Sequence, residues 1–144
     1  MGKVSIIYWS GTGNTEAMAD AMAEGAKDAG AEVELLTVDK ADAAALSDAK
    51  AFALGCPAMG AEELEEGEME PFMAELDSRI AGKTIALFGS YGWGGGEWMR
   101  DWESRVVSDG AAVLSGEGII ADNAPDDDVL AECRAAGAKL AALV

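Results

Sequence analysis

Two hydrophobic patterns alternate along the chain. Continuous apolar runs, typical of strands buried on both faces of a sheet, occupy residues 3–9, 32–38, 50–56, 83–89 and 111–120, the last interrupted by Gly116 and Gly118. Between them, apolar residues recur at helical spacing, which is typical of amphipathic helices. The predicted helices are residues 16–29, a short helix at 41–48, then 71–81, 97–109 and 126–143.

A strand followed by a helix, five times over, predicts an open α/β fold with a mostly parallel sheet. With 144 residues, the chain is long enough for one domain with its own core, and we expect a single domain over residues 1–144. In such sheets ligands bind beyond the carboxyl ends of the strands, at the switch point of the strand order. The loops of interest are therefore 10–15, 56–63, 89–97 and 121–126.

Composition excludes several functions. The chain has 27 acidic and 10 basic residues and a net charge of -17, which argues against nucleic acid or an anionic membrane as a partner and favours a basic protein surface. No apolar run spans a membrane and no signal peptide is evident, so we expect a cytoplasmic protein with free thiols at Cys56 and Cys133. There is no histidine, and two cysteines cannot complete a zinc site, so we predict no metal site.

The first loop, SGTGNT at residues 10–15, predicts a phosphate site without a cation. A helix that begins here offers unpaired N–H groups and partial positive charge, and the two glycines let the backbone curl around an anion. A P-loop is excluded because no lysine follows the second glycine, and the dinucleotide fingerprint fails at Glu16. A plain glycine turn remains the alternative for this loop alone.

Two further loops offer groups suited to a flat ring. Met59 supplies a thioether beside Gly60, and Trp93 lies among glycines, where an indole has no helix face to pack on. Trp98 and Trp102 have the spacing of a helix core, and we expect them, like Trp9, to be structural. A phosphate loop, a thioether and an indole together favour flavin mononucleotide (FMN).

Three segments resemble the flavodoxins, specifically the short-chain members of anaerobic bacteria such as clostridia and Megasphaera: YWSGTGNTEAMA at 8–19, LGCPAMGAEELEE at 54–66 and ALFGSYGWGGGEWM at 86–99. The resemblance implies a three-layer, doubly wound, five-stranded parallel sheet in the order 2-1-3-4-5 with noncovalently bound FMN. It implies a monomeric one-electron carrier, not an enzyme, that works at low potential through the semiquinone/hydroquinone couple and exchanges electrons with redox enzymes that otherwise use ferredoxin.

By position, the resemblance gives each segment a role toward FMN. Residues 10–15 would hold the phosphate, Met59 and Trp93 would flank the ring, the 59–62 turn would face N5, Glu62 would bind N3, and the amide near Gly92 would reach the N1/O2 edge. The predicted cofactor-binding residues are Ser10, Gly11, Thr12, Gly13, Asn14, Thr15, Ala58, Met59, Gly60, Ala61, Glu62, Ser90, Tyr91, Gly92 and Trp93.

Ala61 departs from the family pattern, in which Gly, Asp, Asn or Ser is frequent. The peptide after Gly60 flips in this family on one-electron reduction, and the flipped turn needs a positive φ at residue 61. Alanine resists that conformation by about 1 kcal/mol.

Acidic residues crowd the expected flavin edge. They are Glu62, Glu63, Glu65, Glu66, Glu68 and Glu70, and no base lies between Lys50 and Arg79. Their charge would disfavour the reduced, anionic flavin and so lower the second potential, and it would steer the protein to basic patches on partners. The alternative is a merely solvated acidic loop.

Two other functional classes fit the chain less well. A flavodoxin-like FMN enzyme such as a quinone reductase would need a substrate domain, a nicotinamide site and proton donors, and none is recognisable. A phospho-accepting receiver domain would need acidic residues after the first and third strands and a lysine after the fourth, and these are missing at 8–10, 56–58 and 89–91.

Overall fold

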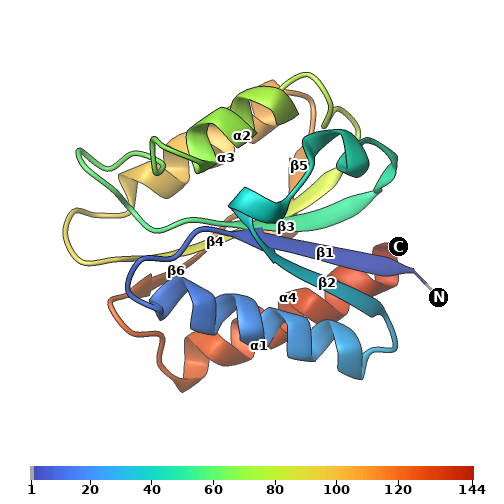
Figure 1. Ribbon diagram of the computed structural model, residues 1–144. Coiled ribbons are helices and arrows are strands. Elements are labelled where there is room, and N and C mark those ends of the chain that lie inside the picture. The colour runs from blue at the N-terminus through green and yellow to red at the C-terminus, as the bar shows by residue number, and fades with distance from the viewer. Residues whose placement is uncertain (1) are drawn as a thin grey trace.

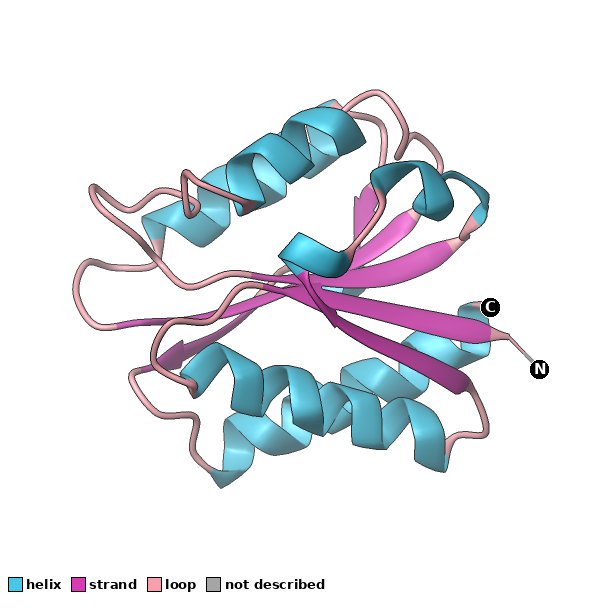
Figure 2. Ribbon diagram, in the orientation of Figure 1, coloured by secondary structure: helices cyan, strands magenta, loops and turns pink. Residues whose placement is uncertain are grey.

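A computed structural model describes residues 2–144 of the chain as a sheet between two helical layers (Figures 1 and 2). The helices α1 and α4 cover one face, and α2 and α3 cover part of the other (Figure 1). The strands are β1 (Lys3–Tyr8), β2 (Glu32–Thr37), β3 (Ala51–Gly55), β4 (Thr84–Tyr91), β5 (Ala112–Val113) and β6 (Ile119–Asp122). The α-helices are α1 (Asn14–Asp28), α2 (Met69–Leu76), α3 (Glu97–Ser108) and α4 (Asp127–Leu143). Three short 3-10 helices are η1 (Val38–Lys40), η2 (Ala43–Asp48) and η3 (Leu114–Gly116).

The strand order confirms the predicted topology. All paired strands are parallel, and the order is β2-β1-β3-β4-β5. The predicted fifth strand is split, because both β5 and β6 pair with β4 and η3 separates them. At the break Ser115 and Gly116 have φ values of 63° and 85°. A Cβ at Gly118, just before β6, would meet the sulfur of Met99, so a larger residue here would require the Met99 side chain of α3 to move.

The core has two parts, one on each face of the sheet. Phe52, Trp98 and Trp102 are among its fully buried side chains on the α2/α3 side, and Met18, Met22 and Phe88 lie on the α1/α4 side. The helices α1 and α4 approach closely because Gly25 and Gly137 lie at their contact. A Cβ at Gly25 would strike the carbonyl of Arg134, and one at Gly137 would strike that of Met22.

Two predicted helices differ from the structure. The segment expected at 41–48 forms one 3-10 helix, η2, and not an α-helix; η1 ends before this segment begins. The helix expected at 71–81 begins earlier and ends earlier, as α2. It begins early because the Glu65 carboxylate accepts hydrogen bonds from the N–H groups of residues 67, 68 and 69, at 2.7, 2.7 and 3.0 Å. None of the helices within residues 2–144 has the length and apolarity that crossing a membrane requires.

Candidate functional site

A cleft lies at the carboxyl ends of β1, β3 and β4, where the strand order reverses. Its volume is about 430 Å³, within the range of about 300–1,000 Å³ for small-molecule sites. Loops that are distant in sequence form its wall, and the lining residues are Trp9, Gly11, Thr12, Asn14, Pro57, Ala58, Met59, Ser90, Tyr91, Gly92, Trp93 and Asn123. Three of the four predicted loops therefore meet here as expected, and the fourth contributes Asn123.

The loop of residues 10–15 presents unpaired backbone donors at the start of α1. The Ser10 hydroxyl oxygen accepts from the N–H groups of Gly13 and Glu16, at 3.2 and 3.3 Å, and thereby closes the loop. Gly13 adopts a left-handed φ of 93°, a conformation that favours glycine. Within residues 2–144, the N–H groups of Gly11, Thr12, Asn14 and Thr15 donate to no protein acceptor. This set of neutral donors fits a single phosphate.

A buried contact ties this loop to the end of β4. The Thr15 hydroxyl lies 3.3 Å from the Ser90 hydroxyl and accepts from the Ser90 N–H at 3.4 Å. The Ser90 carbonyl in turn accepts from the N–H of Ala58 at 3.0 Å. The side chains of Thr15 and Ser90 are thus engaged in fixing the three loops, and the N–H of Thr15 is its free donor.

Aromatic and sulfur groups form the rest of the cleft. Met59 is half-buried in the cleft wall. Trp93 is 52% exposed, so its large indole ring is open to solvent at the cleft. Tyr91 packs on Trp98, with ring centroids 5.6 Å apart. Trp98 and Trp102 are buried, which agrees with their predicted structural role, and the indole N–H of Trp98 donates to the Cys56 carbonyl at 3.0 Å.

No ionised side chain lines the cleft in the part of the chain that the structure describes, although the protein carries a net charge of -17. The nearby carboxylate of Glu16 accepts a hydrogen bond from the Tyr8 hydroxyl at 3.1 Å. Burial of Tyr8, together with this carboxylate, raises the pKa of that phenol to about 12. An anionic phosphate therefore meets only neutral donors at contact distance, with the dipole of α1 behind them.

The turn at 59–63 does not line the cleft as fully as predicted. Met59 and Glu63 pair through two backbone hydrogen bonds, of 2.9 and 2.8 Å, and close the turn. Gly60 and Glu62 adopt positive φ, at 52° and 57°, whereas Ala61 does not. Gly60, Ala61 and Glu62 are missing from the lining, and the Glu62 carboxylate instead accepts from the N–H of Glu97 at 3.2 Å, where it caps α3. Its predicted bond to a ring nitrogen stays a prediction.

Three of the six acidic residues predicted at the cleft edge have structural partners: Glu62, which caps α3, and also Glu65 and Glu70. Glu65 caps α2, and although burial raises its pKa, the three backbone hydrogen bonds lower it more. Glu70 forms an ion pair with Arg105 of α3 at 2.8 Å. Glu63 and Glu66 are exposed beside Met59, so the acidic surface next to the cleft is smaller than the sequence suggests.

Three residues of the cleft were not among the predicted site residues: Trp9, Pro57 and Asn123. Trp9 was expected to be structural, and it does pack against the core, but it also lines the cleft. There the tip of its indole ring lies beside Gly11, and a Cβ added at residue 11 would be 3.1 Å from it. Asn123 has a left-handed φ of 61° and donates its N–H to the Tyr91 carbonyl at 2.7 Å. The topology of the sheet pointed to the loop 121–126, but no residue type within this loop indicated that Asn123 would line the cleft.

Comparison with known proteins gives consistent matches over most of the chain. The family model described as Flavodoxin matches residues 6–137. A flavodoxin of Megasphaera elsdenii is 47% identical over 135 residues, which cover 92% of this chain and 98% of that protein. A flavodoxin of Clostridium beijerinckii is 47% identical over 124 residues, which cover 86% of this chain and 89% of that protein. The solution structure of two-electron reduced Megasphaera elsdenii flavodoxin superposes with a TM-score of 0.86 at 45% identity, and the match covers 94% of this chain and 98% of that one.

Proposed function

The chain belongs to the flavodoxin family and is an FMN-binding electron carrier, not an enzyme, and we propose that it holds the cofactor in the cleft between β1, β3 and β4. This proposal rests on one observation: backbone N–H groups without protein acceptors in the described chain and the exposed indole of Trp93 meet at the same uncharged cleft. When bound, FMN supplies the one-electron chemistry.

The proposed roles follow from the position of each group. The N–H groups of Gly11, Thr12, Asn14 and Thr15 bind the phosphate, helped by the dipole of α1. Met59 and Trp93 cover the two faces of the ring and exclude water from it. The N–H of Gly92, which has no protein acceptor within residues 2–144, donates to the ring edge that lies next to it.

The predicted roles of the remaining site residues are part of the same proposal. Ser10, Gly13 and Ser90 shape the phosphate loop and its anchor, and Ala58 and Tyr91 form the floor. Gly60, Ala61 and Glu62 reach the ring only if the turn moves on cofactor binding, because Glu62 caps α3 in the present arrangement.

The proposed cellular role is that of a low-potential, monomeric carrier in the cytoplasm, built as one domain over residues 1–144. Its partners are redox enzymes that otherwise use ferredoxin and that present basic patches. The net charge of -17 supports this role because negative surroundings disfavour the addition of an electron to the bound ring and attract basic surfaces.

The phosphate site is tested by Thr12→Glu, which places a carboxylate among donors that suit an anion. We expect FMN affinity to fall by several kcal/mol while riboflavin, which has no phosphate, loses much less. Quenching of flavin fluorescence during titration of FMN-free protein measures both affinities. Ala29→Glu is the matched control, because it adds the same charge at the exposed far end of the same helix. Equal losses for FMN and riboflavin would place the phosphate elsewhere.

A further inference from the structure

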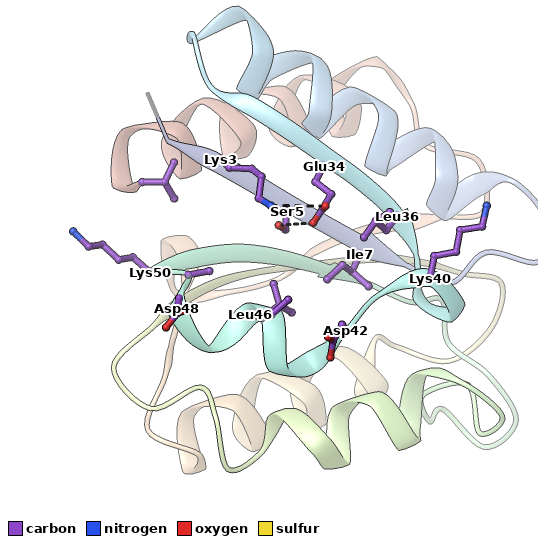
Figure 3. Close-up of a pocket in the computed structure, with 13 residues that line it drawn as sticks. Lys3, Ser5, Ile7, Glu34, Leu36, Lys40, Asp42, Leu46, Asp48 and Lys50 are labelled. Carbon is purple, nitrogen blue, oxygen red and sulfur yellow. Dashed lines mark hydrogen bonds and ion pairs between the residues drawn. The ribbon is translucent and has the colours of Figure 1, made fainter.

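A second hollow, of about 520 Å³, lies on the sheet face over β1 and β2, away from the cofactor cleft. Ser5 and Ile7 of β1 and Leu36 of β2 form its floor, and Leu46 of η2 faces them across the space (Figure 3). The two sites have no lining residue in common. None of the residues around this hollow has a role in the proposed electron-transfer function.

The hollow exists because the connection between β2 and β3 is short. An α-helix in this connection would cover β1 and β2 as α1 does on the opposite face, but the described chain forms the three-residue η1 and the six-residue η2 here instead. Ile7 is 1% exposed and Leu46 is 4% exposed, so both already have apolar neighbours. Leu36 is half-buried and Ala45 is exposed, and they leave apolar surface open in the wall.

The wall formed by η2 is fixed at both ends. The Asp42 carboxylate accepts from the N–H of Ala44 at 3.0 Å and caps the start of η2. At its end, the Lys83 ammonium donates to the carbonyls of Ser47 and Ala49 at 2.7 and 2.6 Å. A charged donor that binds two carbonyls holds this segment in place. The hollow is therefore preformed, as most small-molecule sites are.

A polar centre interrupts the apolar floor. The Ser5 hydroxyl, in a residue that is 5% exposed, donates to the Glu34 carboxylate at 3.3 Å, and the Lys3 ammonium lies 3.8 Å from the same carboxylate (Figure 3). An ammonium has three N–H groups, so Lys3 retains donors that a ligand oxygen can accept from.

The charges around the hollow are balanced, in contrast to the rest of the protein. Its lining side chains are three lysines, Lys3, Lys40 and Lys50, and three acids, Glu34, Asp42 and Asp48. A cation would meet the lysines at short range. An anion would meet the acids and, over a longer range, the net charge of -17. The lining therefore favours a ligand without net charge.

We propose that this hollow is a binding site for an uncharged, compact apolar molecule that carries a carbonyl-type hydrogen-bond acceptor. The apolar body lies against Leu36 and Leu46, and the acceptor oxygen binds the Lys3 ammonium at the floor. The site is separate from the cofactor cleft, because the two share no lining residue.

The test uses FMN-loaded protein and three environment-sensitive dyes: neutral Nile red, anionic anilinonaphthalene sulfonate and cationic thioflavin T. Nile red has the carbonyl acceptor and the uncharged apolar body that the hollow requires. We expect saturable Nile red binding with a blue-shifted emission, and weaker binding of both charged dyes.

Ala45→Trp fills the hollow from an exposed position in its wall, and Ala44→Trp is the matched control on the same turn, exposed but outside the lining. We expect Ala45→Trp to weaken Nile red binding about tenfold or more by excluding the dye, and Ala44→Trp to leave it unchanged. Circular dichroism and retained FMN verify that both variants fold. The proposal is overturned if wild-type protein gives no saturable signal, if the two variants behave alike, or if a charged dye binds more tightly than Nile red.

Discussion

At the scale of single residues, the tryptophans divide into two kinds by their surroundings. Trp93 is 52% exposed at the cleft, whereas Trp98 is 1% exposed and donates its indole N–H to the Cys56 carbonyl. Sequence spacing separated them correctly, because a buried indole recurs at helical intervals with other core residues and Trp93 is flanked by glycines that form no such pattern. Trp9 shows the limit of this reasoning, since one ring packs against the core and lines the cleft at once.

The two kinds of tryptophan predict opposite effects of truncation to alanine. Trp93→Ala removes a ring that covers the cofactor, so we expect FMN affinity to fall by about 1–3 kcal/mol and flavin fluorescence to rise, with little change in unfolding free energy. Trp98→Ala leaves a cavity in the core and should reduce the unfolding free energy by about 3–5 kcal/mol. Flavin titration and urea unfolding measure the two quantities. A larger loss of FMN affinity in Trp98→Ala than in Trp93→Ala would reverse the assignment.

At the scale of elements, a charged network joins α2 to α3. Arg105 of α3 binds Glu70 within α2 and Asp77 at its end, both at 2.8 Å. Burial raises the pKa of Asp77, but hydrogen bonding with Arg105 and Asp109 and the positive charge of Arg105 together lower it more. At the end of α3, burial and then the contact with Asp77 raise the pKa of Asp109 from 3.8 to about 6. The pKa values of the two carboxyl groups are therefore shifted in opposite directions, that of Asp77 down and that of Asp109 up.

This network predicts a pH dependence of stability. The folded protein binds the Asp109 proton more tightly than the unfolded chain does, so Asp109 stabilises the fold below about pH 4, and this contribution is lost as the pH rises through about 6. Asp109→Asn keeps an uncharged partner beside Asp77, so we expect its unfolding free energy to lack this decline. Urea unfolding between pH 4 and 7 measures it. Asp101→Asn, an exposed change on the same helix, is the control and should retain the decline.

Helices and strands were predictable from the sequence where neighbouring residues determine them, and less so where contacts between distant parts of the chain do. The parallel sheet follows from the alternation of apolar runs and helical spacing along the chain, and the glycine loop at 10–15 from its place between a strand and a helix, whereas the strand order came from the resemblance to the flavodoxins. The start of α2 depends on the side chain of Glu65, and the caps by Glu62 and Glu65 use acids that were expected from the sequence to lie at the flavin edge. The hollow beneath η2 was missed because the 41–48 segment carries helical spacing but is too short to cover two strands.

At the scale of the whole molecule, net charge and local charge differ. The chain carries a net charge of -17, yet its cofactor cleft is lined by uncharged groups and the hollow over β1 and β2 is balanced. Neither hollow therefore carries the net negative charge of the whole molecule, the first because its lining is uncharged and the second because three lysines balance three acids. The acidic residues are instead exposed, where they act at long range on partners.

Long-range attraction predicts that electron transfer to basic partners depends on which acids are removed. Glu63→Gln/Glu66→Gln removes two exposed charges beside Met59 at the cleft, and Glu24→Gln/Asp28→Asn removes two exposed charges on α1. If partners dock at the cleft, the first pair should slow the bimolecular transfer to a basic redox protein such as a cytochrome c by about three- to tenfold at low ionic strength, and the second much less. In stopped-flow measurements the difference should shrink as salt is added, because the screening length falls to about 10 Å at 0.1 M. Equal effects of the two pairs would mean that net charge alone steers association and that docking does not occur at the cleft.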